Sequence, residues 1–263
     1  MNITYQINNQ LPALAWIANV VKDQVKVICG RKVETRTNFW VEGAWGGGFL
    51  SADFDSAEWF CGTGAVIRED SIVFATPTGM HAGLYLLEED NEVIISNSLP
   101  FIMAAQGYDF DPKWPWYEKF FNWNVLQGIY KYEKNVHALK IDCDKPKVDE
   151  RIQMILYRNI TVDNRGKVSV EIKRDSKGFD SFDEYHSRLV NTMKSLSINA
   201  QDENRKVKYH VTSFISSGYD AATCSAIAKE AGAESVMTFS AKGKYKADSG
   251  VAAAKYLGYK NVI

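Results

Sequence analysis

The chain has 263 residues, of which 46% are hydrophobic and 24% are charged, fractions typical of a globular protein with enough apolar material for a core. Its 31 basic and 32 acidic residues leave a net charge of −1, which argues against nucleic acid and anionic membranes as partners. Four scattered cysteines without a C-x-x-C pair argue against a zinc site or a disulfide framework, and no apolar run is long enough to span a membrane. We therefore expect a cytoplasmic protein with reduced thiols.

The first hundred residues predict an antiparallel sheet that follows one helix. Residues 12–21 contain a nearly continuous apolar run, which we interpret as a short helix packed against the core. Between residues 39 and 95, short β-rich runs are separated by Gly, Asp and Asn, a spacing that is typical of hairpins. The predicted strands cover residues 63–67, 72–75, 84–87 and 93–96, with a polar turn at 88–91.

Two helical segments follow this sheet. Ser98 stands just before Pro100 and predicts an N-cap, so we expect residues 99–106 to form a short helix. Residues 110–124 contain seven aromatic side chains, which we interpret as a helix packed into a core or a domain interface. An aromatic platform for a ligand is the alternative interpretation of the same run.

A change in the pattern of apolar and polar residues predicts a domain boundary. Residues 128–172 again alternate apolar and polar side chains and are expected to complete the sheet structure, with a turn at 163–166. Charge and glycine then interrupt the apolar pattern between residues 173 and 180. We therefore predict an α+β domain with antiparallel sheets over residues 1–176, followed by the first part of an α/β domain over residues 177–263.

The second domain is predicted to alternate strands and helices. Ser181 and Glu184 resemble a capping box and open an amphipathic helix with apolar positions at 185, 189, 193 and 196. Strands are then predicted at 207–215, 235–239 and 261–263, with one helix that ends at Gly232 and another over 247–257. This order predicts a doubly wound parallel sheet that binds its ligand at the carboxyl ends of the strands.

The turn after the first of these strands carries residues suited to phosphate. Unpaired backbone N–H groups and the positive end of the following helix face such a turn, which favours an anion. Gly218 permits close backbone approach, the two serine hydroxyls can donate hydrogen bonds, and Asp220 is placed to hold Mg²⁺. We therefore predict an ATP site at Ser216, Ser217, Gly218, Tyr219 and Asp220, with Asp220 as the metal ligand. A turn that binds no ligand is the alternative for this motif taken alone.

Together these segments resemble the asparagine synthetase family, whose synthetase domain opens with S-G-G-x-D-S after a buried strand. Thr238-Phe239-Ser240 resembles that family's T-F-S, and Asp248 with residues 252–258 resembles its D-E and the helix that ends in L-G. More weakly, Pro77 and residues 83–85, 95–96 and 128–129 resemble the family's N-terminal glutaminase-like domain. The resemblance implies an N-terminal-nucleophile-hydrolase-like first domain, and it places Ser240 near the nucleotide.

Several departures from the family pattern bear on activity. Position 2 is Asn2, where the glutaminase domain has a catalytic cysteine, and an amide side chain cannot form a thioester. An N-G-E-I-like segment for gripping glutamine is also missing, so we expect no glutamine hydrolysis. In the phosphate loop, Ser217 replaces a glycine and Ala221 replaces the last serine, for which Thr223 is an alternative hydroxyl donor. The family's long helical remainder would follow Ile263, so we expect either a piece of a longer protein or a degenerate relative.

Other residue clusters favour structural roles. The four histidines are too widely spaced for a shared metal site, and the glycines at 46–48 lack the G-K-S/T of a phosphate loop. No G-x-S-x-G elbow of a serine hydrolase occurs. Lys242, Lys244 and Lys246 follow the second strand of the α/β domain, where they either contact phosphate or form a solvated loop.

The resemblance implies an ATP-dependent, AMP-forming ligase. Such an enzyme adenylates a carboxylate, releases pyrophosphate and transfers the acyl group to an amine or ammonia, so its partners are a small-molecule carboxylate and amine. Asparagine is the family's default product, whereas the missing glutaminase residues leave a specialised amide or a modified-sugar substrate open as alternatives. A non-catalytic nucleotide-binding or scaffold relative is the alternative from another functional class, and a homodimer is compatible with either.

Overall fold

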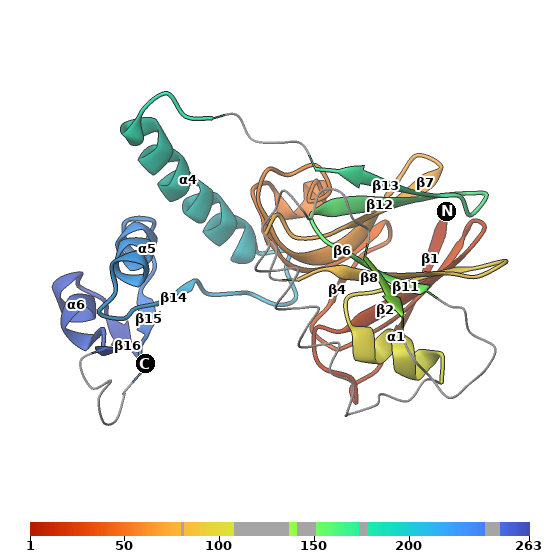
Figure 1. The fold of residues 1–263 in the computed structure, drawn as a ribbon, viewed down its shortest axis with the longest axis horizontal. Helices are drawn as coiled ribbons and strands as arrows, with labels where there is room; N and C mark the ends of the chain where they lie inside the picture. Colours follow the sequence, from red (N-terminus) through yellow and green to blue (C-terminus); the bar gives the residue numbers. More distant parts are fainter. Residues whose placement is uncertain (80–81, 108–136, 141–150, 174–177, 240–247) are drawn as a thin grey trace. The chain divides into compact units, whose positions relative to one another are not determined.

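The computed structural model describes residues 1–79, 82–107, 137–140, 151–173, 178–239 and 248–263 (Figure 1). Contacts divide the chain into unit 1, residues 1–43 and 52–175, and unit 2, residues 44–51 and 176–263. Both units contain strands and helices, and most strand pairs are antiparallel, so the chain has an α+β fold. The segment 110–124, for which we predicted a helix, lies outside the described residues.

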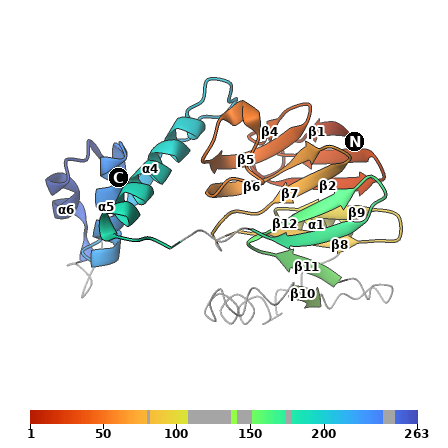
Figure 2. The ribbon, with the colours of Figure 1, turned by 90° about the horizontal axis from the view of Figure 1, so that it is seen from above.

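Unit 1 is built on two β-sheets that stack face to face (Figure 2). The first sheet has the order β1-β3-β2-β9-β8-β11-β10, and the second has the order β13-β12-β7-β6-β5-β4. The strands of the first sheet are β1 (Asn2–Ile7), β2 (Trp16–Val21), β3 (Gln24–Cys29), β8 (Leu84–Glu88), β9 (Val93–Ser96), β10 (His137–Lys140) and β11 (Arg151–Ile155). Those of the second are β4 (Glu34–Thr35), β5 (Phe39–Trp45), β6 (Phe60–Arg68), β7 (Ser71–Ala75), β12 (Arg158–Asp163) and β13 (Val168–Ile172). Strands β1 and β3 run parallel, whereas the pairs around β2, β7, β8 and β12 run antiparallel.

The core of unit 1 lies between these sheets. Alternate residues of β2, namely Trp16, Ala18 and Val20, are buried and belong to the cluster that also contains residues of the second sheet. Trp16 contacts Trp40 edge to face with ring centroids 5.5 Å apart, and it stacks on Phe74 at 6.3 Å. All three rings are inaccessible to solvent, so this aromatic cluster joins the two sheets across the core.

Helix α1 (Leu99–Ala105) packs on the other face of the first sheet. Its Ile102 lies in a second buried cluster with Ile17 of β2. The side chain of Ser98 accepts a hydrogen bond from the N–H of Phe101 at 3.4 Å. The helix predicted over residues 99–106 is therefore confirmed together with its serine cap.

The prediction of a helix over residues 12–21 is wrong, because strand β2 begins at Trp16. Trp16 faces the second sheet and Ile17 faces α1, so both faces of β2 are covered. A strand buried on both faces has a continuous apolar run, and such a run does not distinguish it from a short helix. The four strands predicted between residues 63 and 96 are confirmed as β6 to β9, and the turn at 163–166 joins β12 to β13.

Unit 2 contains a parallel sheet of three strands in the order β14-β15-β16. Its elements in chain order are α4 (Phe182–Ala200), β14 (Thr212–Phe214), α5 (Tyr219–Glu230), β15 (Ser235–Met237), α6 (Val251–Tyr256) and β16 (Asn261–Val262). Ile215, Val236, Ala228 and Ala254 form the centre of its core. The predicted alternation of strands and helices with parallel pairing is therefore confirmed. Within the described ranges, no helix is both long enough and apolar enough to cross a membrane.

Strand β14 is shorter than the predicted 207–215. The N–H of Tyr209 donates to the carbonyl of Ala200 at 3.1 Å, and the Gln201 side chain donates to the carbonyl of Tyr209. These hydrogen bonds attach the chain before β14 to the end of α4, where it cannot pair with the sheet. At the other end of α4, Ser181 accepts from the N–H of Glu184 at 3.1 Å, which confirms the predicted cap.

The segment 44–51 belongs to unit 2, where Arg205 holds it. The Arg205 guanidinium lies 4.5 Å from the ring centroid of Phe49, in the 3₁₀ helix η1 (Phe49–Ser51). Arg205 Nε donates to the carbonyl of Asn199 at 2.6 Å, and Asn199 Nδ2 donates to the carbonyl of Gly47 at 2.8 Å. The glycine run at 46–48 is thus attached to the end of α4 through Gly47, while Gly46 and Gly48 are exposed.

Strands β5 and β6 approach each other closely at Gly43. A Cβ at Gly43 would lie 2.0 Å from the carbonyl oxygen of Cys61, and its φ of +107° is one that L side chains rarely adopt. We expect Gly43→Ala to lower the free energy of unfolding of unit 1 by more than about 2 kcal/mol in urea denaturation. Gly166→Ala is the matched control, because Gly166 has φ +82° but no atom within 4 Å of the Cβ position, and it should cost about 1 kcal/mol. Equal losses in the two variants would contradict a steric role for the close approach.

Candidate functional site

The predicted phosphate loop lies between β14 and α5. Ile215, directly after β14, is buried, and its N–H donates to the carbonyl of Met237 on β15 at 2.9 Å. Residues 217–220 are exposed. The sheet therefore fixes the start of the loop, and the rest of the loop faces solvent at the carboxyl end of the parallel strands.

Helix α5 begins without a side-chain cap. Its N-cap residue is Gly218, which has no side chain to accept hydrogen bonds from the N–H groups of the first turn. In α1 and α4, by contrast, Ser98 and Ser181 each accept from an N–H three residues further on. The first turn of α5 thus leaves N–H groups and the positive end of the helix dipole available to an anion.

Gly218 also leaves space at this helix end. Among the described residues, a Cβ at Gly218 would meet Ser216 Oγ at 3.4 Å and no other atom within 4 Å. The N–H of Gly218 itself donates to Ser216 Oγ at 3.2 Å. Backbone N–H groups and a serine hydroxyl are donors of the kind that bind a phosphate group.

A second loop, residues 248–250, lies against the phosphate loop. Ser217 Oγ donates to Asp248 Oδ1 at 3.0 Å, and Ser216 forms an isolated antiparallel bridge with Ser249. The sheet brings these residues together, since each loop follows a neighbouring parallel strand along the chain. A carboxylate therefore stands beside the predicted phosphate position.

Residues 248–250 are also attached to the sheet. The N–H of Gly250 donates to Thr238 Oγ1 at 2.9 Å, directly after β15. A Cβ at Gly250 would lie 2.7 Å from the carbonyl carbon and oxygen of Ile215, so this glycine allows close backbone contact with the end of β14. The position of Asp248 is thus set by contacts with both strands.

The structure gathers most of the predicted site residues in one place. The residues in the exposed loop are Ser216, Ser217, Gly218, Tyr219 and Asp220. Tyr219 projects into solvent with 92% of its surface exposed. Ser240 lies outside the described residues, as do the three lysines at 242, 244 and 246. Sequence reasoning assigned no role to Thr238 or Asp248, although both lie in runs that resemble the asparagine synthetase family.

Two carboxylates at this site, Asp220 and Asp248, are oxygen ligands of the kind that Mg²⁺ prefers. Asp220 lies in the first turn of α5, and Asp248 bonds to the loop before it. In the part of the chain that the structure describes, no group of three or more His, Cys, Asp or Glu side chains could hold a metal by itself. Mg²⁺ commonly binds one or two carboxylates and completes its shell with phosphate oxygens and water. The donor set therefore fits Mg²⁺ bound to phosphate.

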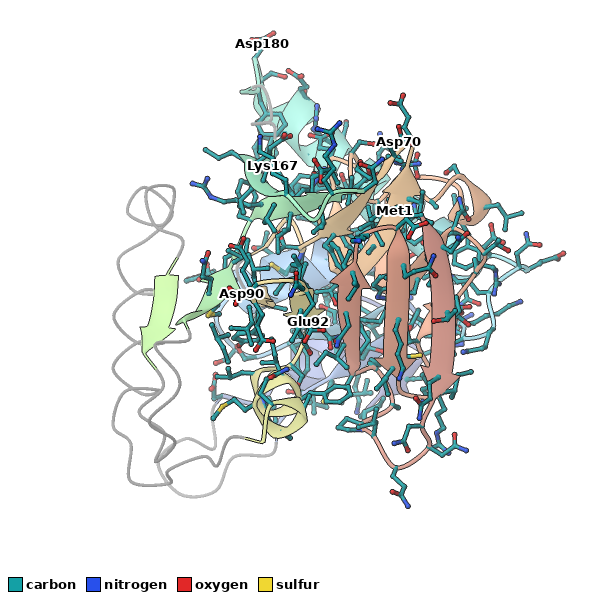
Figure 3. All side chains as sticks on the ribbon, turned by 90° about the vertical axis from the view of Figure 1, so that its right-hand side faces the viewer. Met1, Asp70, Asp90, Glu92, Lys167 and Asp180 are labelled. Atoms are coloured by element: carbon teal, nitrogen blue, oxygen red, sulfur yellow. The ribbon has the colours of Figure 1, made fainter. Side chains whose placement is uncertain are left out.

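Unit 1 has an acidic hollow at the turn between β8 and β9. The hollow has a volume of about 590 Å³ and is lined by Val21 and residues 88–92. Figure 3 labels Asp90 and Glu92 at this turn. Asn19 Nδ2 donates to Glu92 Oε2 at 3.1 Å, which ties the turn to β2. We interpret the hollow as a solvated hairpin turn, in agreement with the polar turn predicted at 88–91.

The residue at position 2, Asn2, is the exposed first residue of β1 at the edge of the first sheet. Figure 3 shows Met1 at the start of this strand. Asn2 pairs with Gln24 at one end of β3, whereas Trp16 pairs with Cys29 at the other end. Position 2 therefore lies a full strand length from Trp16.

A polar cluster joins the two sheets of unit 1 beside Trp16. Thr63 Oγ1 accepts from Trp16 Nε1 at 3.0 Å and donates to Glu42 Oε1 at 2.7 Å. Asn97 Oδ1 accepts from the N–H of Trp16 at 2.9 Å, which leaves its amide nitrogen to donate to Glu42. Burial raises the pKa of Glu42 to about 7, although the hydrogen bonds from Thr63 and Asn97 act in the opposite direction. No local motif marks this cluster, because its residues come from distant parts of the sequence.

The raised pKa of Glu42 predicts a pH-dependent stability. Since the folded pKa of about 7 lies above the ordinary value of 4.5, the folded state binds this proton more tightly than the unfolded state. The resulting stabilisation is complete below pH 4.5 and is lost as pH rises through 7. We expect Glu42→Gln to reduce the fall in the free energy of unfolding between pH 5 and pH 8 by roughly 2 kcal/mol. Glu88→Gln, at an exposed site in the same unit, should leave the fall in the free energy of unfolding unchanged. The same pH dependence in the unaltered chain, Glu42→Gln and Glu88→Gln would refute a raised pKa of Glu42.

Comparison with known proteins identifies no relative. No family model matches the sequence, and a search of curated proteins found no match. Function is therefore inferred from the geometry of the loop at α5 and from the family resemblance of its residues.

Proposed function

We propose that unit 2 binds ATP with Mg²⁺ at the loop between β14 and α5, as part of an asparagine-synthetase-like, amide-forming ligase. The observation that carries this proposal is the glycine N-cap of α5, which leaves a helix N-terminus open directly after a parallel strand. Ser216, the N–H groups after Gly218 and the carboxylate of Asp220 would surround the phosphates. Ser240 belongs to the proposed site through the family resemblance alone.

The proposed reaction activates a carboxylate and then forms an amide. A carboxylate oxygen attacks the α-phosphorus of ATP, the bond to pyrophosphate breaks, and an amine or ammonia then attacks the acyl carbon and releases AMP. Negative charge develops on phosphate oxygens in the first step, and fixed N–H donors stabilise such charge without reorganisation. Mg²⁺ bound by Asp220 would neutralise part of that charge.

Unit 1 is proposed to be a degenerate glutaminase-like domain with an N-terminal-nucleophile-hydrolase-like fold. Two stacked, mostly antiparallel sheets support this proposal. The exposed amide side chain of Asn2 offers no nucleophile for glutamine hydrolysis. We therefore propose that the amine comes from solution or from a substrate, and not from glutamine cleaved by this chain.

One observation favours the alternative of a non-catalytic nucleotide-binding or scaffold relative. The hydroxyl of Ser217, which replaces a glycine of the family loop, already donates to Asp248. A loop whose donor is occupied in this way binds phosphate more weakly. Binding of ATP without adenylate formation on any carboxylate would support this second candidate.

The proposal predicts that a methyl group at Gly218 blocks ATP. Gly218 has φ −74° and ψ 149°, which alanine adopts without strain, and its Cβ position has only an ordinary contact. We expect Gly218→Ala to weaken Mg²⁺-ATP binding at least tenfold, about 1.4 kcal/mol, in isothermal calorimetry, and Gly218→Val to weaken it further. Asp220→Ala should also weaken binding, because it removes the proposed metal ligand.

Gly178→Ala is the matched control for this experiment, since Gly178 lies in unit 2 and no atom of the residues that the structure describes lies within 4 Å of its Cβ position. It should bind ATP as the unaltered chain does. Equal affinities of Gly218→Ala and Gly178→Ala would contradict phosphate binding at the helix end, as would a complete absence of ATP binding by the unaltered chain.

A further inference from the structure

The hydroxyl of Ser217 is engaged by a carboxylate. Its Oγ donates to Asp248 Oδ1 at 3.0 Å, and a serine hydroxyl has a single proton to donate. The same hydroxyl cannot donate to a phosphate oxygen while it is bonded to Asp248. A phosphate that uses Ser217 must therefore displace this hydrogen bond.

The backbone holds Asp248 beside the loop. Ser249 forms a bridge with Ser216, and the N–H of Gly250 donates to Thr238 Oγ1 at 2.9 Å. These contacts fix the chain directly after Asp248 to the ends of two strands. The exposed side chain of Asp248 retains its torsional freedom, so the carboxylate can change partners while its backbone stays in place.

The carboxylate of Asp248 has the same sign of charge as a phosphate and lies in the same region. Its partner Ser217 directly precedes the N-cap residue Gly218, where the positive end of α5 attracts anions. An incoming phosphate would therefore meet a like charge beside the loop.

We propose that Asp248 competes with phosphate at this loop and thereby makes nucleotide binding depend on Mg²⁺, an inference that rests on the proposed function. A nucleotide without metal is repelled by the Asp248 carboxylate. When Mg²⁺ accompanies the phosphates, Asp248 turns from Ser217 to the metal, which prefers oxygen ligands of this kind. The hydroxyl of Ser217 then donates to a phosphate oxygen. The loop thus selects the magnesium complex over the free nucleotide.

The test is calorimetric titration of ATP in excess Mg²⁺ and in EDTA. We expect Asp248→Asn to strengthen binding in EDTA by on the order of tenfold, because it removes one like charge, and to narrow the ratio of the two affinities accordingly. Ser217→Ala removes the bond that holds the carboxylate at the loop, so it should narrow the ratio by a smaller factor. Glu203→Gln makes the same change in net charge at another exposed carboxylate of unit 2, and it should leave the ratio unchanged.

Four outcomes separate this inference from the proposed function. The inference is supported if the ratio of ATP affinity in Mg²⁺ to that in EDTA falls about tenfold in Asp248→Asn and does not change in Glu203→Gln. If Asp248→Asn leaves the ratio of the two ATP affinities unchanged, the inference about Asp248 is overturned, whereas the proposed ATP binding stands. Loss of Mg²⁺-ATP binding by Asp248→Asn, with no gain in EDTA and an unaltered circular dichroism melt, also overturns it, since the carboxylate would then be a metal ligand only. Failure of the unaltered chain to bind ATP in either condition overturns the proposed function itself.

Discussion

Burial of Trp16 between two sheets is the interaction on which unit 1 depends. Its indole packs on Trp40 and Phe74 of the second sheet, and its Nε1 donates to Thr63. Its carbonyl oxygen also accepts from Ser96 Oγ at 2.7 Å. Truncation of a buried ring of this size commonly lowers the free energy of unfolding by about 3–5 kcal/mol. Through the contacts above, the same side chain also holds the two sheets together and positions the polar cluster.

Unit 2 follows a different principle, because its important polar groups are left open at the surface. Serine hydroxyls close the first turns of α1 and α4, whereas the glycine before α5 closes nothing. A side-chain cap stabilises a helix, so α5 is less stable without one. Locally destabilising features of this kind are common at ligand-binding sites, where backbone N–H groups must be free to bind the ligand.

Local patterns in the sequence predicted the elements whose stabilising contacts are also local. The serine caps at Ser98 and Ser181 and the polar turns between β6 and β9 depend on residues within four positions of each other. Strand β2 was mistaken for a helix because coverage of both its faces removes the alternation that marks a strand.

Long-range contacts escaped prediction for a related reason. The hydrogen bond between Ser217 and Asp248 joins residues 31 positions apart, and that between Trp16 and Thr63 joins residues 47 apart. No recurring sequence pattern marks either pair of residues, so neither hydrogen bond could be predicted from the sequence. The phosphate loop was predictable because one strand-to-helix turn contains all its residues, whereas its acidic neighbour is defined only by the order of strands in the sheet.

The direction of β1 limits what a nucleophile at position 2 could reach. Position 2 and the cluster around Glu42 lie at opposite ends of the strands, a separation of roughly 17 Å for five residue steps along β1. A cysteine introduced at position 2 would find none of these buried polar side chains within reach. A single substitution to cysteine at position 2 therefore cannot create a hydrolytic centre that uses the Glu42 cluster, because the architecture of the sheet keeps the two apart.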